Sequence, residues 1–435
     1  MKCQFCARLI ESIKETIFSE DFLSSHRSSP KAFTRQRSLP FHQLIFFLMN
    51  MNKGSYQDEL DQFFKALNHL EVAERIVTKG ALTKARKKLD YHSFIELNEH
   101  MTSHYYSHFP TVSWYGFNLL AVDGSTLRVP DETEIVEHFG VWNVKKGDPC
   151  PKARISQMFD VLNRVTVDAL IKPKKDGERE LASFHFLKLM PNDLILLDRG
   201  YPAFWLFKLI MSMNADFCAR VSCTKWKVIR KFYHSGQQES IVKLNPTSLS
   251  ARKCSEMGFD NDPIKVRLIR VELSTGETEI LITSLTDMNK HPINIFADLY
   301  HKRWPVEEDY KTMKCRMQLE NFSGKSTLSV YQDFHAKVFS KNFTSIVANT
   351  TKDKIEELSE HRNFRYQINF AQALSKMKHT IVLLFTRPAE QAKLLIKKLQ
   401  KIFFQTVEQV RPGRKFKRKH KVKLKKFHAA YKPIC

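Results

Sequence analysis

The chain has 435 residues, of which 43% are apolar and 27% charged, so it can bury the cores of several domains. Lys and Arg outnumber Asp and Glu by 70 to 46, and the formal charge of +24 favours polyanions because neutralised phosphates release counterions. The apolar runs are far shorter than the roughly 20 residues of a membrane helix, and eight cysteines are too few for a disulfide scaffold. The sequence lacks P-loop, dinucleotide-binding, zincin and nucleophile-elbow motifs. We therefore expect a cytoplasmic protein, and nucleic acid is the first partner to consider, ahead of an acidic membrane surface.

The first 110 residues are predicted to be helical. Ser38 is the expected cap of a helix in which Phe41, Leu44, Ile45 and Leu48 share one face. Ser55 and Asp58 have the spacing of a capping box at the start of a second helix. A third helix, at 81–89, is basic, and either its cations form a solvated face or the helix lies on DNA; the cations concerned are Arg86, Lys87 and Lys88.

From about residue 115 the pattern indicates alternating strands and helices. We expect a strand that ends before Asp123, a hairpin, a helix, a strand that ends before Asp198, a further helix and a last strand. The corresponding segments are 119–122, 155–162 with 165–171, 178–190, 194–197, 204–211 and 217–221. The order of these segments indicates an α/β domain.

The rest of the chain is predicted to contain an insertion, a helical region and a basic tail. Residues 223–290 look like an all-β insertion, with strands at 266–272 and 277–285 joined by a turn at 274–276. Helical periodicity returns after Pro292 and persists to about residue 405. The stretch 411–427 holds ten Lys or Arg residues without a core-forming pattern, which is typical of a disordered cationic arm.

Two carboxylates occupy matching places in this pattern. Asp123 and Asp198 each follow a short apolar strand, and the ends of strands are where α/β proteins bind ligands. Either residue alone is more simply interpreted as part of a turn. Two of them at matching positions favour a functional site.

A third carboxylate lies in a row of polar residues after the insertion. Tyr300, Arg303, Glu307 and Lys314 would lie within a stripe about 60° wide on one continuous helix. An acid flanked by two cations and a phenol suits a metal ion beside a phosphate backbone. Pro305 lies inside this row, and proline kinks a helix or begins one, so the stripe holds only if the helix continues through it.

These residues resemble the IS-four family of bacterial insertion-sequence transposases. Tyr300, Arg303, Glu307 and Lys314 match its Y-(2)-R-(3)-E-(6)-K signature, and the contexts DGST at 123–126 and DRGY at 198–201 resemble its first two acidic motifs. The resemblance extends from about residue 33 to about residue 345.

The resemblance implies an α/β fold with an RNase H-like core, a mixed five-stranded sheet with flanking helices. A β-rich insertion would interrupt this core, and helical regions would precede and follow it. The expected divisions are a DNA-binding helical region at 1–110, the first part of the core at 111–222, the insertion at 223–290, the completion of the core at 291–345, a helical region at 346–408 and the tail at 409–435.

The resemblance also implies an activity, which is cut-and-paste transposition by hydrolysis and strand transfer at the ends of the element. Asp123, Asp198 and Glu307 are the expected catalytic residues and ligands of two Mg²⁺ or Mn²⁺ ions, because hard cations prefer oxygen ligands. Tyr300, Arg303 and Lys314 are expected to bind DNA. The implied partners are double-stranded DNA, in the form of terminal inverted repeats and target, and a second copy of the chain; no nucleotide cofactor is implied, and the location would be the bacterial nucleoid.

Other interpretations of the sequence remain open. The chain could be a catalytically silent DNA-binding protein derived from a transposase, or a basic RNA-binding protein. Trp226 could stack on an extruded base, although a core Trp is the simpler interpretation. Cys3 and Cys6 form half of a zinc motif, and His100, His104 and His108 share a helix face, but neither set has further ligands at metal spacing.

Overall fold

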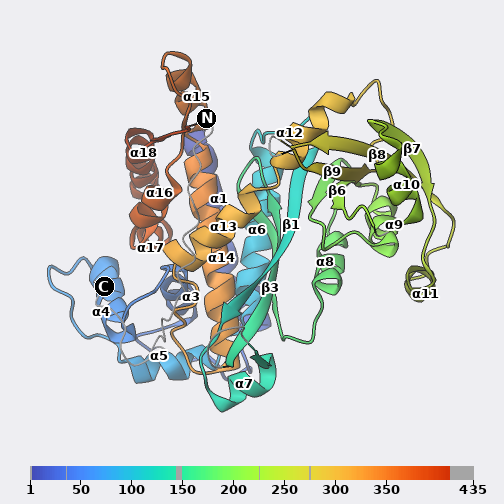
Figure 1. Cartoon of the computed structure of the whole chain (residues 1–435). Coiled ribbons are helices and arrows are strands. Elements are labelled where there is room, and N and C mark those ends of the chain that lie inside the picture. The colour runs from blue at the N-terminus through green and yellow to red at the C-terminus, as the bar shows by residue number, and fades with distance from the viewer. Residues whose placement is uncertain (1, 36, 144–148, 225, 274–275, 412–435) are drawn as a thin grey trace. The chain divides into compact units, whose positions relative to one another are not determined.

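The computed structural model describes residues 2–411 except 36, 144–148, 225 and 274–275. The predicted basic tail, apart from its first residues, and most of the predicted turn at 274–276 lie outside these residues. The chain divides into two compact units (Figure 1). The first comprises residues 1–110, 127–153 and 311–435, and the second comprises 111–126 and 154–310. Within the described ranges, none of the helices combines the length and the apolarity that crossing a bilayer requires.

The first unit is mainly helical and contains both the N-terminal and the C-terminal parts of the described chain. Helix α1 packs on α18 and α6, and α14, which is buried along nearly its whole length, packs on α6 and α3. The helices before the second unit are α1 (Lys2–Phe18), α2 (Glu20–His26), α3 (Phe41–Met49), α4 (Tyr56–Asn68), α5 (Lys79–Arg86) and α6 (His92–His108). Helix α7 (Thr133–Phe139) and the short strand β2 (Val141–Trp142) follow β1 (Asn118–Arg128). The later elements are a π-helical turn (Thr312–Arg316), α14 (Thr327–Asn349), α15 (Lys352–Glu360), β10 (Tyr366–Gln367), α16 (Phe370–Met377), α17 (Thr380–Thr386), α18 (Ala389–Gln405) and β11 (Glu408–Gln409).

Helix α4 begins where predicted but without the predicted capping box. Ser55 is its N-cap residue, yet its side chain accepts no capping hydrogen bond, so the predicted box with Asp58 is wrong. The buried carboxylate of Glu59 accepts instead from the backbone N–H groups of Lys53 and Gly54, both at 2.8 Å. Glu59 therefore fixes the loop before the helix and does not cap the N–H groups of its first turn.

The other N-terminal predictions also change in detail. Helix α3 begins directly after Pro40, so Ser38 is not its cap. In α5, Arg86 is buried and its guanidinium lies 2.8 Å from Asp333 of α14, while Lys87 is exposed. Arg86 therefore belongs neither to a solvated face nor to a surface that lies on DNA, because it joins α5 to the central helix of this unit.

The second unit is built on a mixed sheet. Its strands run in the order β3-β1-β5-β6-β9-β8-β7, with β4 paired to β3; β1, β5 and β6 are parallel, and the β3–β4 and β6–β9–β8–β7 pairs are antiparallel. The bounds are β1 (Asn118–Arg128), β3 (Cys150–Asp160), β4 (Val165–Lys172), β5 (Asp193–Leu197), β6 (Asp216–Val221), β7 (Glu239–Leu244), β8 (Ile264–Glu272) and β9 (Thr278–Thr283). The strands β4, β3, β1, β5 and β6 form the mixed five-stranded sheet predicted for an RNase H-like core, and the α/β prediction is confirmed.

Helices cover this sheet and enclose its core. The helices are α8 (Glu178–Phe186), α9 (Phe204–Ser212), α10 (Lys227–Ser235), α11 (Ser248–Glu256), the 3-10 turn Ile293–Ile295, α12 (Phe296–His301) and α13 (Pro305–Lys311). Alternate apolar residues of the strands pack against α8 to α11, because successive strand side chains point to opposite faces. These strand residues are Leu120, Val122, Met158, Ile195, Leu197, Phe217, Ala219, Val221, Leu244, Ile264, Val266, Leu268, Ile280 and Ile282.

The segment 223–290 extends the core sheet. The two strands predicted at 266–272 and 277–285 are confirmed as β8 and β9. The all-β prediction is wrong, because α10 and α11 flank β7. Strand β9 pairs with β6, so the sheet that carries the candidate site continues into this segment without interruption.

Candidate active site

Asp123 and Asp198 lie side by side at the end of a parallel strand pair. Strands β1 and β5 pair in register up to Val122 and Leu197, and each acid is the next residue along its strand. Neighbouring strands lie about 4.8 Å apart, so the register brings the two acids together. Asp123 does not end its strand as predicted, since β1 continues to Arg128, but it marks where the fully buried run gives way to half-buried residues.

The predicted single helix that carries the third acid is broken at Pro305. Tyr300 lies in α12, which ends at His301, and Arg303 lies in the following turn. Helix α13 starts at Pro305 and places Glu307 in its first turn, which suits a residue without a backbone N–H. The helix begins at Pro305, the alternative that the sequence left open, so the row does not form one continuous stripe.

Arg303 nevertheless contacts both Glu307 and Tyr300, the residues on either side of it in the predicted row. Its guanidinium lies 2.7 Å from Glu307 Oε1 and 5.9 Å from the centroid of the Tyr300 ring. Arg303 is 5% exposed, whereas the Glu307 side chain is 28% exposed, so the ion pair is half-buried. Lys314 lies in the π-helical turn Thr312–Arg316 and belongs to the first unit, whereas the other five predicted site residues belong to the second.

Asp198 is held by an arginine and a tyrosine. Arg220 of β6 lies 2.8 Å from Asp198 Oδ1 and also pairs with Glu279 at 2.5 Å, while the Tyr300 hydroxyl donates to Asp198 at 3.3 Å. Burial opposes ionisation of Asp198, but the Arg199 N–H and the Arg220 guanidinium outweigh it and lower its pKa. Asp198 is therefore an ionised carboxylate at neutral pH.

Asp123 has the opposite electrostatic balance. Burial raises its pKa to about 6; the Arg303 guanidinium and the Gly124 N–H act against this rise, whereas Glu307 and Asp198 add to it. The electrostatic coupling shows that the three predicted acids share one neighbourhood. A carboxylate crowded by two others is destabilised when ionised, and a cation placed among them would relieve that cost.

Helix α13 is fastened to the strand that carries Asp123. The Tyr310 hydroxyl donates to the Asp123 carbonyl at 2.8 Å, one turn after Glu307. In the same helix, Asp309 accepts from the amide of Gln157 in β3 at 3.2 Å. These two bonds fix the position of the helix against the sheet.

A row of buried hydrogen bonds connects Asp168 to the backbone of Asp123. The Asp168 carboxylate lies 2.6 Å from His185 Nδ1, His185 Nε2 lies 2.9 Å from Ser156 Oγ, and Ser156 Oγ lies 3.4 Å from the Asp123 carbonyl. Ser156 is almost fully buried, so this Ser-His-Asp arrangement cannot meet a substrate as a nucleophile. It supports the strand instead, and Lys188 also pairs with Asp168 at 2.8 Å.

The donor chemistry of the site fits a divalent cation, since its three acids offer oxygen ligands, which Mg²⁺ and Mn²⁺ prefer. Among the described residues, however, no group of three or more His, Cys, Asp and Glu side chains is already arranged to hold one ion. Guanidinium groups hold Asp198 and Glu307 in this arrangement.

Sequence reasoning missed Arg220, Tyr201 and Tyr310. Arg220 is a cation in the otherwise apolar run 217–221, and this isolation was the available signal. Tyr201 and Tyr310 lie three residues after Asp198 and Glu307, but tyrosine is common in cores, so spacing alone did not distinguish them.

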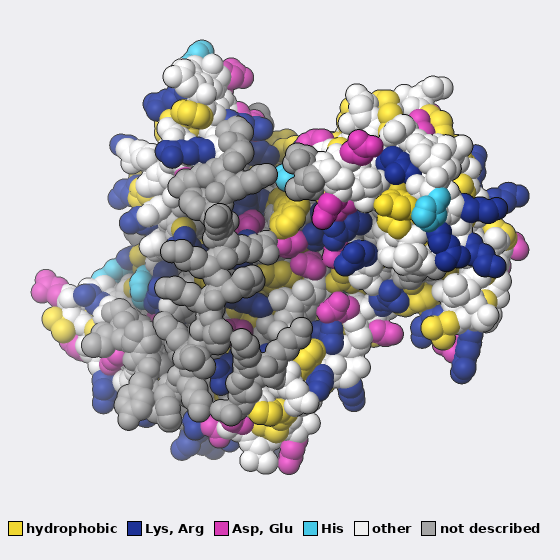
Figure 2. Space-filling view, viewed as in Figure 1, with side chains coloured by type: hydrophobic (Ala, Val, Ile, Leu, Met, Phe, Trp, Pro, Cys, Tyr) yellow, Lys and Arg dark blue, Asp and Glu magenta, His cyan; other side chains and the backbone are white. Residues whose placement is uncertain are grey.

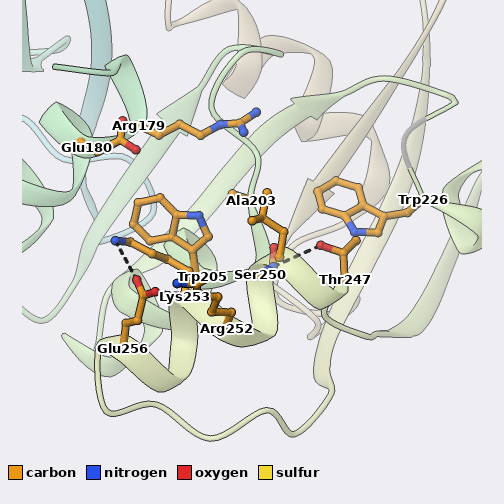
Figure 3. A pocket seen from close by; sticks show the side chains of 11 residues that line it. Arg179, Glu180, Ala203, Trp205, Trp226, Thr247, Ser250, Arg252, Lys253 and Glu256 are labelled. Carbon is orange, nitrogen blue, oxygen red and sulfur yellow. Dashed lines mark hydrogen bonds and ion pairs between the residues drawn. The ribbon is translucent and has the colours of Figure 1, made fainter. Parts of the chain in front are cut away.

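A cavity of about 400 Å³ adjoins the turn after Asp198 (Figure 3). Trp205 and Trp226 line it on either side of Ala203. Arg179, also at the cavity, donates to the Gly200 carbonyl at 3.0 and 2.8 Å. Trp226 is 7% exposed and packs in the sheet core, and its stacking on a base stays a prediction.

The cysteine and histidine motifs lie in the first unit. Cys6 is buried, and the Cys3 thiol lies 3.8 Å from the Lys393 carbonyl. In α6, the rings of His104 and His108 stack with centroids 4.4 Å apart. These contacts are ordinary helix packing.

Comparison with known proteins identifies the family. Residues 114–343 match the model of the transposase DDE domain, which is more than half of the chain. The chain therefore belongs to the DDE transposase family. Proteins of this family generally use divalent metal ions.

Two relatives come from Escherichia coli strain K12. The chain is 26% identical to transposase InsG for insertion sequence element IS4 over 295 residues, which cover 67% of this chain and 65% of InsG. It is 27% identical to the putative transposase InsZ over 109 residues, which cover 25% of this chain and 36% of InsZ. The resemblance to the IS-four family is confirmed, and the match spans just under two thirds of the length of InsG.

A solved structure is also similar. It is the piggyBac transposase synaptic complex with hairpin DNA, with a TM-score of 0.45 and 11% sequence identity, covering 94% of this chain and 86% of the other.

Proposed function

We propose that this chain is a transposase that cuts DNA at the ends of an insertion sequence and joins those ends to a target. The observation that carries the proposal is the register of β1 and β5, which places Asp123 and Asp198 side by side, together with the electrostatic coupling of Asp123 to Glu307. Membership of the DDE transposase family supports the same activity.

In this proposal the three acids hold two Mg²⁺ or Mn²⁺ ions. Asp123 would serve both ions, Asp198 one and Glu307 the other. When bound, such a pair activates the attacking oxygen and stabilises the leaving oxygen of a phosphodiester. Glu307 would exchange its ion pair with Arg303 for a metal ligand bond.

Tyr300, Arg303 and Lys314 would then bind DNA. A guanidinium can fork onto a phosphate, an ammonium offers a point charge, and a phenol offers a hydroxyl and a stacking face. Arg220 would act with Arg303, because both guanidinium groups already lie beside the acids.

The proposed partner is double-stranded DNA, as terminal inverted repeats and as target. Figure 2 shows Lys and Arg side chains gathered over the part of the second unit that carries α10, β7 and α11. The exposed cations of this segment include Lys227, Arg230, Lys231, Lys243, Arg252 and Lys265. Such a surface attracts phosphates.

We also propose that residues 1–110 contribute to DNA binding and that two copies of the chain hold the paired ends. The exposed Leu394 of α18 is one apolar position at which copies could meet. A DNA substrate would place the protein at the nucleoid. The six divisions of the chain predicted from sequence stay part of this proposal.

The deciding experiment compares strand cleavage by the wild type and by Asp123→Asn with Mn²⁺ or Mg²⁺ and DNA that carries the element ends. The wild type should nick this DNA, and Asp123→Asn should lose at least a hundredfold in rate. Asp262→Asn is the matched control, because it removes an exposed carboxylate from the same unit and should cut normally. A wild type that binds the ends but never cuts them would support the alternative, a catalytically silent DNA-binding protein.

A further inference from the structure

The Tyr201 hydroxyl is a buried donor without a hydrogen-bond partner among the described residues. Tyr201 is 3% exposed, and its ring packs into the core of the second unit. Its backbone N–H donates to the Asp198 carbonyl at 3.0 Å, so the turn after β5 fixes the position of the ring. A buried polar atom left unpaired costs free energy, and such atoms recur where a ligand completes the structure.

The hydroxyl faces the acidic site. A β-carbon added to Gly124 would lie 3.2 Å from the Tyr201 oxygen, so the hydroxyl lies directly beside the residue that follows Asp123. Burial raises the Tyr201 pKa well above its ordinary value, and the charges of Asp123, Glu178 and Asp198 raise it further. Tyr201 therefore lies among carboxylates as a neutral donor, yet it bonds to none of them.

Two neighbouring donors share this condition. The Nε atoms of Arg220 and Arg303 are also buried and lack partners among the described residues. Both guanidinium groups use other nitrogens to hold Asp198 and Glu307. The surroundings of the acids thus contain three unused N–H or O–H groups, and an oxygen-rich ligand would satisfy them.

We propose that Tyr201 is a substrate-binding residue whose hydroxyl donates a hydrogen bond to an oxygen that enters the site beside Asp123. The inference deepens the proposed function and rests on it. The shared chemistry is an oxygen acceptor, and its two sources are a phosphate oxygen of the DNA and a water carried by the divalent ion.

The test is Tyr201→Phe, which removes only the hydroxyl, with Tyr310→Phe as the matched control. Without metal or DNA, Tyr201→Phe should melt at the same temperature as the wild type or higher, because the lost hydroxyl had no partner. Tyr310→Phe should melt lower, because its hydroxyl bonds to the Asp123 carbonyl. A clear loss of stability in Tyr201→Phe would show a structural role and overturn the proposal.

Single-turnover cleavage then tests the role in binding. Tyr201→Phe should cut end-containing DNA about tenfold more slowly in Mg²⁺, the usual scale of one hydrogen bond to a charged group. If the partner is a phosphate oxygen, its affinity for this DNA in Ca²⁺ should also fall severalfold. If the partner is a metal-bound water, the affinity should hold while the Mg²⁺ concentration for half-maximal rate rises.

The outcomes separate the two proposals. A wild type that cuts DNA, with Tyr201→Phe equal to it in rate, DNA affinity and Mg²⁺ dependence, would overturn the role of Tyr201 alone. A wild type that does not cut would end the proposed function. In that case a weakened affinity of Tyr201→Phe for the DNA would still support the hydrogen bond, and an unchanged affinity would reject it.

Discussion

Asp123→Asn should make the metal-free protein more stable at neutral pH. The pKa of Asp123 rises from its ordinary value of 3.8 to about 6 in the folded protein. Each pKa unit corresponds to about 1.36 kcal/mol, so the ionised carboxylate costs about 3 kcal/mol of folding free energy. The folded protein binds this proton more tightly than the unfolded chain, so the stabilising contribution is complete below pH 4 and is lost as the pH rises through 6. Asparagine resembles the protonated acid and carries no such cost.

Urea unfolding at several pH values, followed by the fluorescence of the buried Trp205 and Trp226, measures this difference. Wild type and Asp123→Asn should unfold alike near pH 4, and the variant should be more stable by up to about 3 kcal/mol at pH 7.5. Adding Mg²⁺ at pH 7.5 should narrow the gap, because a ligand at a hundred times its Kd contributes about 2.7 kcal/mol. A gap that is the same at both pH values, or that also occurs in Asp262→Asn, would refute the electrostatic reasoning.

Three further predictions concern the surroundings of the acids and the tail. Arg220→Met should raise the pKa of Asp198 and move the acid limb of the cleavage pH profile to higher pH, whereas Arg220→Lys should restore most of the wild-type profile. Asp168→Asn should cost about 3 kcal/mol in urea unfolding at pH 7, because it removes the buried carboxylate that bonds to His185 and pairs with Lys188; an equally stable variant would show that this carboxylate does not support the strand of Asp123. Deleting residues 411–435 should weaken non-specific DNA binding and flatten its salt dependence, which a titration at several salt concentrations measures. A lost preference for the element ends would contradict this view of the tail.

The positions of the acids could be predicted from sequence where a short run of neighbouring residues determines the backbone geometry. Asp123 and Asp198 follow apolar runs that become parallel neighbours, so the run lengths set their register. Pro305 indicated from the sequence alone where one helix stops and the next begins, because proline acts on the backbone of its immediate neighbours. Arg220 and Tyr201 were missed because their roles arise from contacts between β6, the turn after β5 and the acids, and no spacing along the chain encodes those contacts.

Two features of the candidate site, its crowded acids and its buried donors, indicate together what should bind there. Asp123 is costly to ionise because it is buried near two other acids, so the site requires positive charge. The Tyr201 hydroxyl and the Nε atoms of Arg220 and Arg303 are buried and have no hydrogen-bond partner within the described part of the chain, so acceptor oxygens would suit the site. A bare cation would suit the acids alone, and a bare phosphate would be repelled by the acids. A divalent ion together with a phosphodiester suits both features, because the ion neutralises the acids and the phosphate accepts from the donors. We therefore expect metal and DNA to bind cooperatively, with the affinity for end-containing DNA rising severalfold in Ca²⁺ in the wild type and changing little in Asp123→Asn.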